Sequence, residues 1–126
     1  MIISETSYNE LIENLELMAL GGPLWSSTKD YSETYEGRIE VFFIILRRLI
    51  EEERIRLAKN GEFLKGTIDD QIKLFKNAFP TEERMKEVAS YWWFMDDCPA
   101  GSVWIIDREI DGFTTPAGDG KHYYWA

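Results

Sequence analysis

The sequence is poor in the side chains that form disulfides and metal centres. Its 126 residues include a single cysteine, Cys98, and a single histidine, His122. One cysteine cannot form a disulfide within the chain, which is typical of a reducing compartment, so we expect a cytoplasmic protein. One Cys and one His cannot complete a zinc site, and the acidic residues lack the spacing of a calcium-binding loop. We therefore expect no metal ion and no other cofactor.

Long hydrophobic runs are also absent. The longest uninterrupted apolar run, residues 41–46, is far shorter than the roughly 20 residues of a membrane-spanning helix. The opening residues, MIISETSYNE, have neither the basic start nor the apolar stretch of a secretory signal peptide. A chain of 126 residues buries enough surface to fold without disulfides, so we expect a single domain over residues 1–126.

Positively charged side chains are outnumbered, with 14 Lys and Arg against 23 Asp and Glu and a net charge of −9. The imbalance is greatest at residues 1–37, where seven acids and one base give −6. Residues 38–80 hold seven acids and nine bases, or +2, and residues 81–126 hold nine acids and four bases, or −5. Such a surface repels nucleic acid and anionic membranes, so we expect neither as a partner, and it attracts a basic protein. The alternative is that these acids only keep the protein soluble and bind no partner.

Apolar residues recur at helical spacing in four segments of the sequence. The expected helices span about 7–20, 33–53, 67–79 and 81–95. Ser7 and Glu10 have the form of a capping box, and Gly-Gly-Pro at 21–23 stops the first helix. Thr67 is expected to cap the third helix, with Asp69 and Asp70 in its first turn. The second helix is apolar on all sides in its middle, so we expect it to be central and covered. Three of its side chains are expected to be buried: Phe42, Phe43 and Leu46.

Alternating runs of polar and apolar residues predict short strands. Residues 54–65 contain two such runs around Asn60-Gly61, which is the strongest local signal for a β-hairpin. Residues 103–106 are typical of a buried strand and 121–125 of a final strand, with a turn predicted at 116–120. Together the segments predict an α+β fold, with about four helices and a small, mainly antiparallel sheet.

The segment FMDDCPAGSVWII, residues 94–106, contains the main candidates for a reactive or ligand-binding site. A reactive cysteine needs a nearby cation or a helix N-terminus, whereas Cys98 follows a helix C-terminus and two carboxylates, so we expect an unreactive thiol. For Asp96 and Asp97 two interpretations stay open: a turn in which backbone amides bind Asp97, or a pair that faces a basic partner. If the protein is an enzyme or binds a small ligand, we expect its pocket near Asp96, Asp97, Cys98 and His122. No serine lies in a nucleophile elbow, so no catalytic residue is predicted.

Three stretches carry a resemblance to a known family: RIRLAKNGEFLKGTIDDQIKLFKNAFP, WWFMDDCPAGSVWIID and PAGDGKHYYW. They resemble a small family of uncharacterised bacterial proteins, the domain of unknown function 596 family, over nearly the whole chain. This resemblance implies no established reaction and no functional residue to transfer. The chain is also similar in style to toxin-immunity proteins of bacterial competition systems, which are small, acidic, cytosolic and rich in exposed aromatic residues.

The acidic N-terminal third and its aromatic residues make protein binding the leading hypothesis, in the form of an immunity protein that neutralises a basic toxin domain. Acidic side chains would steer the encounter, and aromatic rings would anchor it. The expected contact residues are Glu10, Glu13, Glu16, Trp25, Asp30, Tyr31, Glu33 and Glu36. The alternatives are the pocket described above and a homodimer whose additional aromatic residues form the subunit interface.

Overall fold

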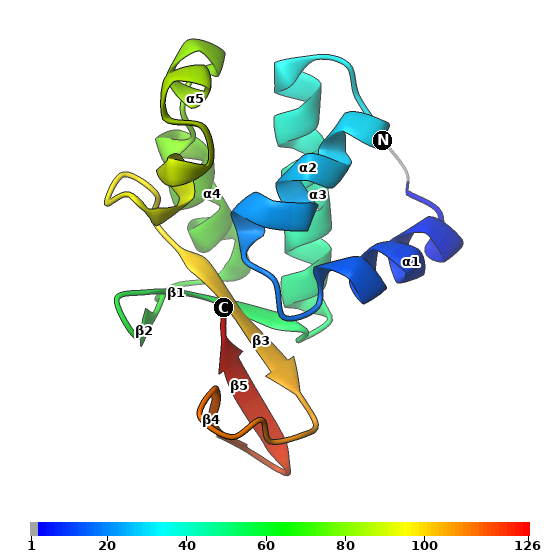
Figure 1. Ribbon diagram of the computed structural model, residues 1–126, viewed down its shortest axis with the longest axis vertical. Helices are drawn as coiled ribbons and strands as arrows, with labels where there is room; N and C mark the ends of the chain where they lie inside the picture. The colour runs from blue at the N-terminus through cyan, green and yellow to red at the C-terminus, as the bar shows by residue number, and fades with distance from the viewer. Residues whose placement is uncertain (1–2) are drawn as a thin grey trace.

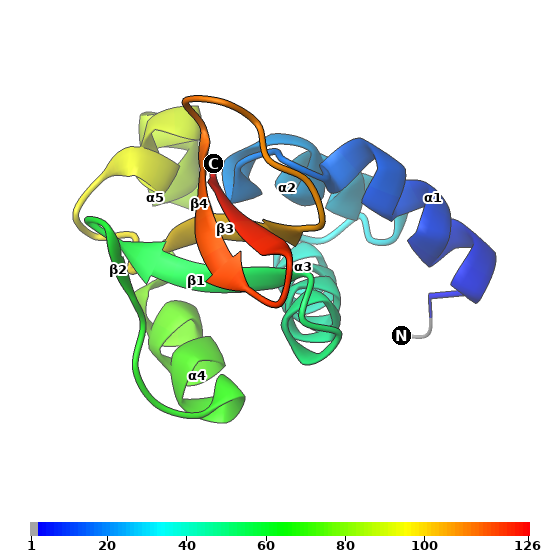
Figure 2. The same ribbon diagram turned by 90° about the horizontal axis from the view of Figure 1, so that it is seen from below.

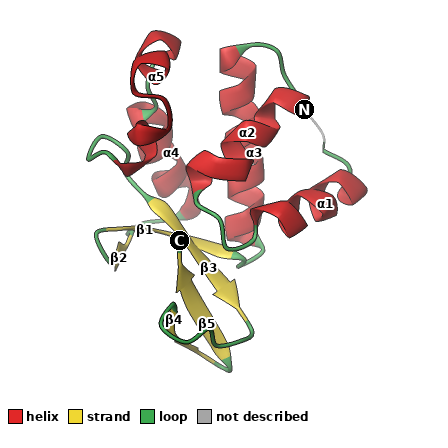
Figure 3. Cartoon of the chain, in the orientation of Figure 1, coloured by secondary structure: helices red, strands yellow, loops and turns green. Residues whose placement is uncertain are grey.

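In the computed structural model, which describes residues 3–126, helices and strands occupy separate sides of the molecule (Figures 1 and 3). Five α-helices lie in this part of the chain: α1 (Glu5–Leu15), α2 (Trp25–Ser27), α3 (Tyr35–Glu51), α4 (Ile68–Ala78) and α5 (Glu82–Val88). The shorter helical turns are η1 (Leu20–Leu24), η2 (Thr28–Asp30) and the 3₁₀ helix η3 (Ala89–Phe94). The strands are β1 (Ile55–Lys59), β2 (Glu62–Phe63), β3 (Gly101–Ile106), β4 (Thr114–Gly118) and β5 (Lys121–Trp125). The predicted α+β class is confirmed, and α2 is a single turn in a segment where the sequence predicts no helix.

The first helix begins and ends earlier than the sequence predicts. Its N-cap is Ser4, whose hydroxyl accepts a hydrogen bond from the backbone N–H of Ser7 at 3.1 Å. Ser7 therefore lies inside the helix, and the predicted capping box of Ser7 and Glu10 is wrong. At the other end Leu17 adopts a left-handed φ of 68°, so α1 stops at Leu15, before the Gly-Gly-Pro segment. The prediction failed because two serines three positions apart both precede apolar residues, and only one of them can cap the helix.

The third and fourth predicted helices correspond to α4 and to α5 followed by η3. Thr67 caps α4 as predicted: its hydroxyl accepts from the N–H of Asp70 at 3.1 Å, and the Asp70 carboxylate accepts from the N–H of Thr67 at 3.0 Å. The fourth predicted helix is interrupted at Ala89, where φ is 50° and ψ is −132°. Beyond this break the chain forms the 3₁₀ helix η3, in which Trp92 and Trp93 are both buried.

The strands form one antiparallel sheet in the order β2-β1-β3-β5-β4. Asn60 and Gly61, with φ of 54° and 80°, form the two-residue turn of the predicted β1–β2 hairpin. The turn predicted over 116–120 is wrong for its first three residues, which belong to β4, and the turn is confined to residues 119–120. Pro116 is tolerated because β4 is an edge strand, and the register shifts between Pro116 and Gly118.

The sheet is curled, and its two faces have different neighbours. One face packs on the helices and contributes four buried side chains to the core: Ile55, Leu57, Trp104 and Ile106. On the other face the ring centroid of Phe63 in β2 lies 4.9 Å from that of Tyr123 and 5.2 Å from that of Trp125 in β5. Two strands separate β2 from β5, which corresponds to roughly 14 Å in a flat sheet. The contact therefore requires the sheet to bend toward this face, and Figure 2 shows β5 crossing in front of β1 and β3.

The core surrounds α3 and contains eight aromatic rings in mutual contact, which we call the aromatic cluster. Its members are Trp25, Tyr35, Phe42, Phe43, Phe75, Phe79, Trp92 and Trp93, with neighbouring centroids 5.0–6.4 Å apart. These separations are in the range of favourable aromatic pairs. Phe42, Phe43 and Leu46 are buried, which confirms α3 as the central helix. Tyr35 donates a hydrogen bond to the carbonyl of Pro80 at 2.8 Å, and burial raises the pKa of Tyr35 to about 12.

Candidate functional site

Asp96 and Asp97 occupy the two central positions of a turn between η3 and β3. The backbone closes this turn, because the N–H of Cys98 donates to the carbonyl of Met95 at 3.1 Å. Both carboxylates are exposed, and within residues 3–126 neither forms a side-chain hydrogen bond or an ion pair. The turn therefore forms without hydrogen bonds to the Asp97 side chain, and the two negative charges have no partner inside the described chain.

Cys98 and His122, the other two residues of the predicted pocket, lie far apart. Cys98 is fully buried, and its Sγ donates to the carbonyl of Ala100 at 3.3 Å. His122 stands opposite Ile106 at the far end of β3, a strand whose six residues span roughly 17 Å. The structure therefore does not bring Cys98 and His122 together, and the four residues of the predicted pocket do not converge on one site.

We expect the Cys98 thiol to react slowly with thiol reagents. Burial raises the pKa of this thiol, and the smaller contributions of a backbone hydrogen bond at Ala100 and of Lys59 lower it. A thiol reagent at neutral pH should therefore label Cys98 at least about tenfold more slowly in the native protein than in the urea-unfolded chain. The measurement is the absorbance of the released thiolate, with Cys98→Ser as the blank. Labelling as fast in the native protein as in urea would contradict the expectation.

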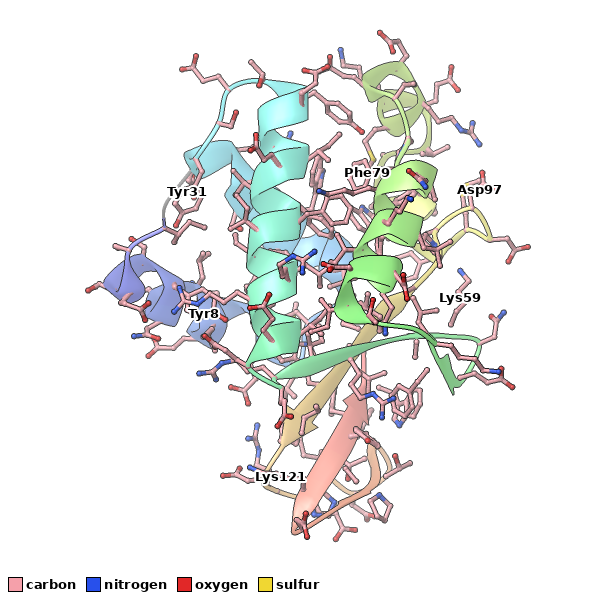
Figure 4. The ribbon with its side chains drawn as sticks, turned by 180° about the vertical axis from the view of Figure 1, so that it is seen from behind. Tyr8, Tyr31, Lys59, Phe79, Asp97 and Lys121 are labelled. Carbon is pink, nitrogen blue, oxygen red and sulfur yellow. The ribbon has the colours of Figure 1, made fainter. Side chains whose placement is uncertain are left out.

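Six exposed carboxylates form what we call the acidic N-terminal surface. They are Glu10 and Glu13 on α1, Glu16 directly after it, and Asp30, Glu33 and Glu36 between α2 and the first turn of α3. Glu16 pairs with Arg108 at 3.5 Å, whereas the other five form no ion pair within the described chain. Figure 4 shows Tyr31, which follows Asp30, on the same side of α3 as Tyr8 of α1. The two segments that carry these acids therefore lie on the same side of α3.

The two aromatic residues expected to anchor a partner, Trp25 and Tyr31, both pack against other side chains of this protein. Trp25 is half-buried and contacts four rings of the aromatic cluster, and the guanidinium of Arg38 lies 4.2 Å from its ring centroid. Arg38 also donates to the hydroxyl of Thr28 at 2.9 Å and to the carbonyl of Trp25 at 3.2 Å. Tyr31 is half-buried and packs against the core. The Trp25 ring is thus a packing element, and a partner contact through Tyr31 stays a prediction.

The most exposed aromatic rings lie elsewhere, on η3. Tyr91 is 74% exposed and Phe94 is 76% exposed. The sequence predicts a continuous helix over both residues, and neither is among the expected contact residues. A signal was available in the four consecutive aromatic residues 91–94, because a helix at the surface of a domain buries only one of its sides.

A polar network joins α1 to the end of α3 and the start of β1. The carboxylate of Glu52 accepts hydrogen bonds from Tyr8 at 2.9 Å, from Arg48 at 3.0 Å and from Arg54 at 2.8 Å. Arg48 also pairs with Glu5 at 2.6 Å, and its guanidinium lies 3.6 Å from the Tyr8 ring centroid. Partial burial raises the pKa of Glu52, but the hydrogen bonds from Arg54, Tyr8 and Arg48 together outweigh it and lower the pKa. These contacts give the network a structural role, which is to hold α1 against the body of the protein.

An open groove of about 670 Å³ lies between the α3–β1 turn and the β4–β5 turn. Its charged lining is Glu52, Glu53 and Asp119 against Arg54, Arg56 and Lys121. The charges balance, and the guanidinium of Arg56 is already placed 3.7 Å from the Phe63 ring centroid and donates to the Tyr123 hydroxyl at 3.1 Å. The groove therefore has no charge preference by which to select a ligand. Within the described residues, no three His, Cys, Asp or Glu side chains are grouped closely enough to hold a metal ion.

Residues 50–126 match a family model described as "Protein of unknown function, DUF596". The chain belongs to the DUF596 family. This finding confirms the family resemblance seen in the three sequence stretches. No helix in residues 3–126 of this DUF596 protein combines the length and the apolar character needed to cross a membrane.

Among solved structures, the DUF596 chain is similar to one described as "Uncharacterized Protein Conserved in Bacteria, COG3792 from Neisseria meningitidis". The two chains are 25% identical and superpose with a TM-score of 0.70, and the match covers 95% of this chain and 88% of the other. The common fold therefore extends through most of α1–α3, which the family model does not match. No curated protein matches the sequence.

The DUF596 match includes the exposed rings and carboxylates of residues 91–97 but not the acidic N-terminal surface. Residues 50–126 contain the sheet, α4, α5 and η3, and with them Tyr91, Phe94, Asp96 and Asp97. The acidic N-terminal surface precedes this region. The two surfaces are therefore separate candidates for a functional site.

Proposed function

We propose that this DUF596 protein binds a basic protein partner, and that it is an immunity protein that neutralises a basic toxin domain. The observation that supports this proposal is the acidic N-terminal surface, where five exposed carboxylates have no ion-pair partner in the described chain. Residues 1–37 contain seven acids and only Lys29 as a base, so the bases of this segment offset only one of its negative charges. A basic domain would supply the missing positive charge.

The expected mechanism combines steering with occlusion. Carboxylates that are gathered on one surface attract a basic domain over distances comparable to the Debye length and raise the association rate. Glu10 and Glu13 lie about one helical turn apart on α1, where like charges repel and mildly destabilise the helix. A bound cationic side chain would relieve this repulsion. Once docked, the protein would cover the surface through which the toxin domain acts on its own substrate.

The test first asks whether a basic domain is encoded next to this gene and copurifies with the protein, and then measures the association kinetics of the separated pair. Glu10→Gln/Glu13→Gln should slow association several-fold at about 0.1 M salt, and the difference should vanish near 1 M, where the Debye length falls to about 3 Å. Glu62→Gln/Asp119→Asn is the matched control, because it removes the same charge from exposed positions on the sheet. Equal slowing by both double variants, or rates independent of salt, would contradict a role for the acidic N-terminal surface. Failure of the neighbouring domain to bind would contradict the proposed function itself.

A further inference from the structure

Residues 91–97 display two aromatic rings and two carboxylates on one short segment, which we call the 91–97 surface. Tyr91 and Phe94 are three positions apart in a 3₁₀ helix, which has three residues per turn, so they lie above one another on the same side of η3. Asp96 and Asp97 follow in the turn that leads to β3 and are exposed. Large rings that remain about three-quarters exposed beside unpaired charges are unusual in a region that is otherwise well packed.

The backbone beneath this surface is firmly held. Trp92 and Trp93, which lie between the two exposed rings in the sequence, are buried in the aromatic cluster with centroids 5.0 Å apart. The ammonium of Lys59 in β1 donates a hydrogen bond to the carbonyl of Met95 at 2.9 Å, and this ties the turn to the sheet. Rings that are displayed from a fixed backbone lose little conformational freedom when a partner covers them, which favours binding.

We propose that the 91–97 surface binds a Lys- and Arg-rich segment of another protein. The faces of Tyr and Phe rings attract ammonium and guanidinium groups. A carboxylate beside the ring supplies a charge-assisted hydrogen bond to the same cation, and Arg uses both contacts best. Lys59 forms no ion pair with Asp96 or Asp97 within the described chain, so its ammonium, which is held at the Met95 carbonyl, offsets the charge of the two carboxylates only in part. The charge of the surface thus selects a basic occupant, and the rings bind the aliphatic stems of its side chains.

This surface is separate from the acidic N-terminal surface. Figure 4 shows Asp97 on one side of the molecule and Tyr8 and Tyr31 on the opposite side, with α3 and α4 between them. One compact partner cannot cover both surfaces. The inference therefore goes beyond the proposed function and holds or fails independently of it.

The test is a titration of the ¹⁵N-labelled protein with a short synthetic peptide of Arg, Lys, Leu and Gly, followed by NMR. The control peptide has the same Leu and Gly residues and Glu in place of every basic residue. We expect the basic peptide to shift the amide signals of residues 91–97 and the acidic peptide to leave them unchanged. Tyr91→Ala/Phe94→Ala should weaken binding by about tenfold or more, and Asp96→Asn/Asp97→Asn by about threefold to tenfold with a smaller salt dependence.

Two variants serve as controls for this titration. Phe113→Ala removes another exposed ring, 61% exposed and outside the surface, and should change the affinity by less than about twofold. Glu10→Gln/Glu13→Gln should leave the shifts at residues 91–97 intact, which separates this inference from the proposed function. Absence of shifts at these residues, or equal shifts with the acidic peptide, would overturn the proposal. Concentration-dependent dimerisation that is lost in Tyr91→Ala/Phe94→Ala would also overturn it, since the occupant would then be a second copy of this chain.

Discussion

Replacing Phe42 by alanine should lower the free energy of unfolding by about 3–5 kcal/mol. Phe42 is fully buried on the central helix, and its ring contacts five members of the aromatic cluster. Those neighbours come from α2, α3, α4 and η3, so the cavity left by the ring has walls fixed by four separate elements. Such walls relax only in part, and the cost of the cavity adds to the lost transfer free energy.

The measurement is urea unfolding followed by circular dichroism. The matched control is Phe94→Ala, because it makes the same chemical change at a side chain that is 76% exposed, and it should cost less than about 0.5 kcal/mol. The slope of the free energy against urea should be equal in both variants and in the parent protein. A loss below about 1 kcal/mol for Phe42→Ala would show that the aromatic cluster is loosely packed or that it repacks.

The second large effect is expected at Gly21, where alanine should destabilise the protein by about 1–3 kcal/mol. A Cβ at this position would overlap the Trp93 ring at its Cγ, Cδ1 and Cδ2 atoms. The Trp93 side chain cannot easily adopt another rotamer, because it is buried and contacts five other rings of the aromatic cluster. The backbone around Gly21 or η3 must therefore shift to accommodate the methyl group.

Gly22 provides the matched comparison for this substitution. No atom lies within 4 Å of a Cβ built on Gly22, so Gly22→Ala introduces no clash and should destabilise the protein less than Gly21→Ala does. Thermal unfolding of the two variants side by side tests the pair. Equal destabilisation would mean that the Gly-Gly segment is needed for its backbone freedom, and that the close approach to Trp93 is not the reason for glycine at position 21.

Local patterns were sufficient to predict α3, α4 and the β1–β2 hairpin. The middle of α3 is apolar on all sides, Thr67 and Asp70 form the predicted cap, and Asn60-Gly61 adopts the positive φ values that the turn requires. Each of these signals depends on residues only a few positions apart. The β4 strand could not be predicted in this way, because Pro and Gly are turn signals in the sequence, and only the position of β4 at the sheet edge makes Pro116 acceptable.

The candidate site residues could not be predicted from local patterns, because their positions depend on contacts between distant parts of the chain. Alanine favours helices, so nothing in the sequence predicts that Ala89 interrupts the fourth helix, and without that break Tyr91 and Phe94 are not placed together on one side of η3. Trp25 is expected at an interface because it is an aromatic residue in the acidic N-terminal third, whereas tertiary packing draws it into the aromatic cluster. The distance between Cys98 and His122 follows from the register of β3 with β5, which the spacing of the two residues does not determine.

The curl of the sheet has a consequence for the order in which the protein folds. The β1–β2 and β4–β5 hairpins each need only a two-residue turn, whereas β1 pairs with β3 across α4, α5 and η3. Phe63 meets Tyr123 and Trp125 only when the β1–β3 and β3–β5 pairings are both in place, so its ring stays in water until the whole sheet has bent around it. Contacts between such distant parts of a chain form slowly, because the intervening segment must first lose its freedom. The helical side should therefore gain its structure first, and the stacking of Phe63 on Trp125 should be among the last events on the path to the native state.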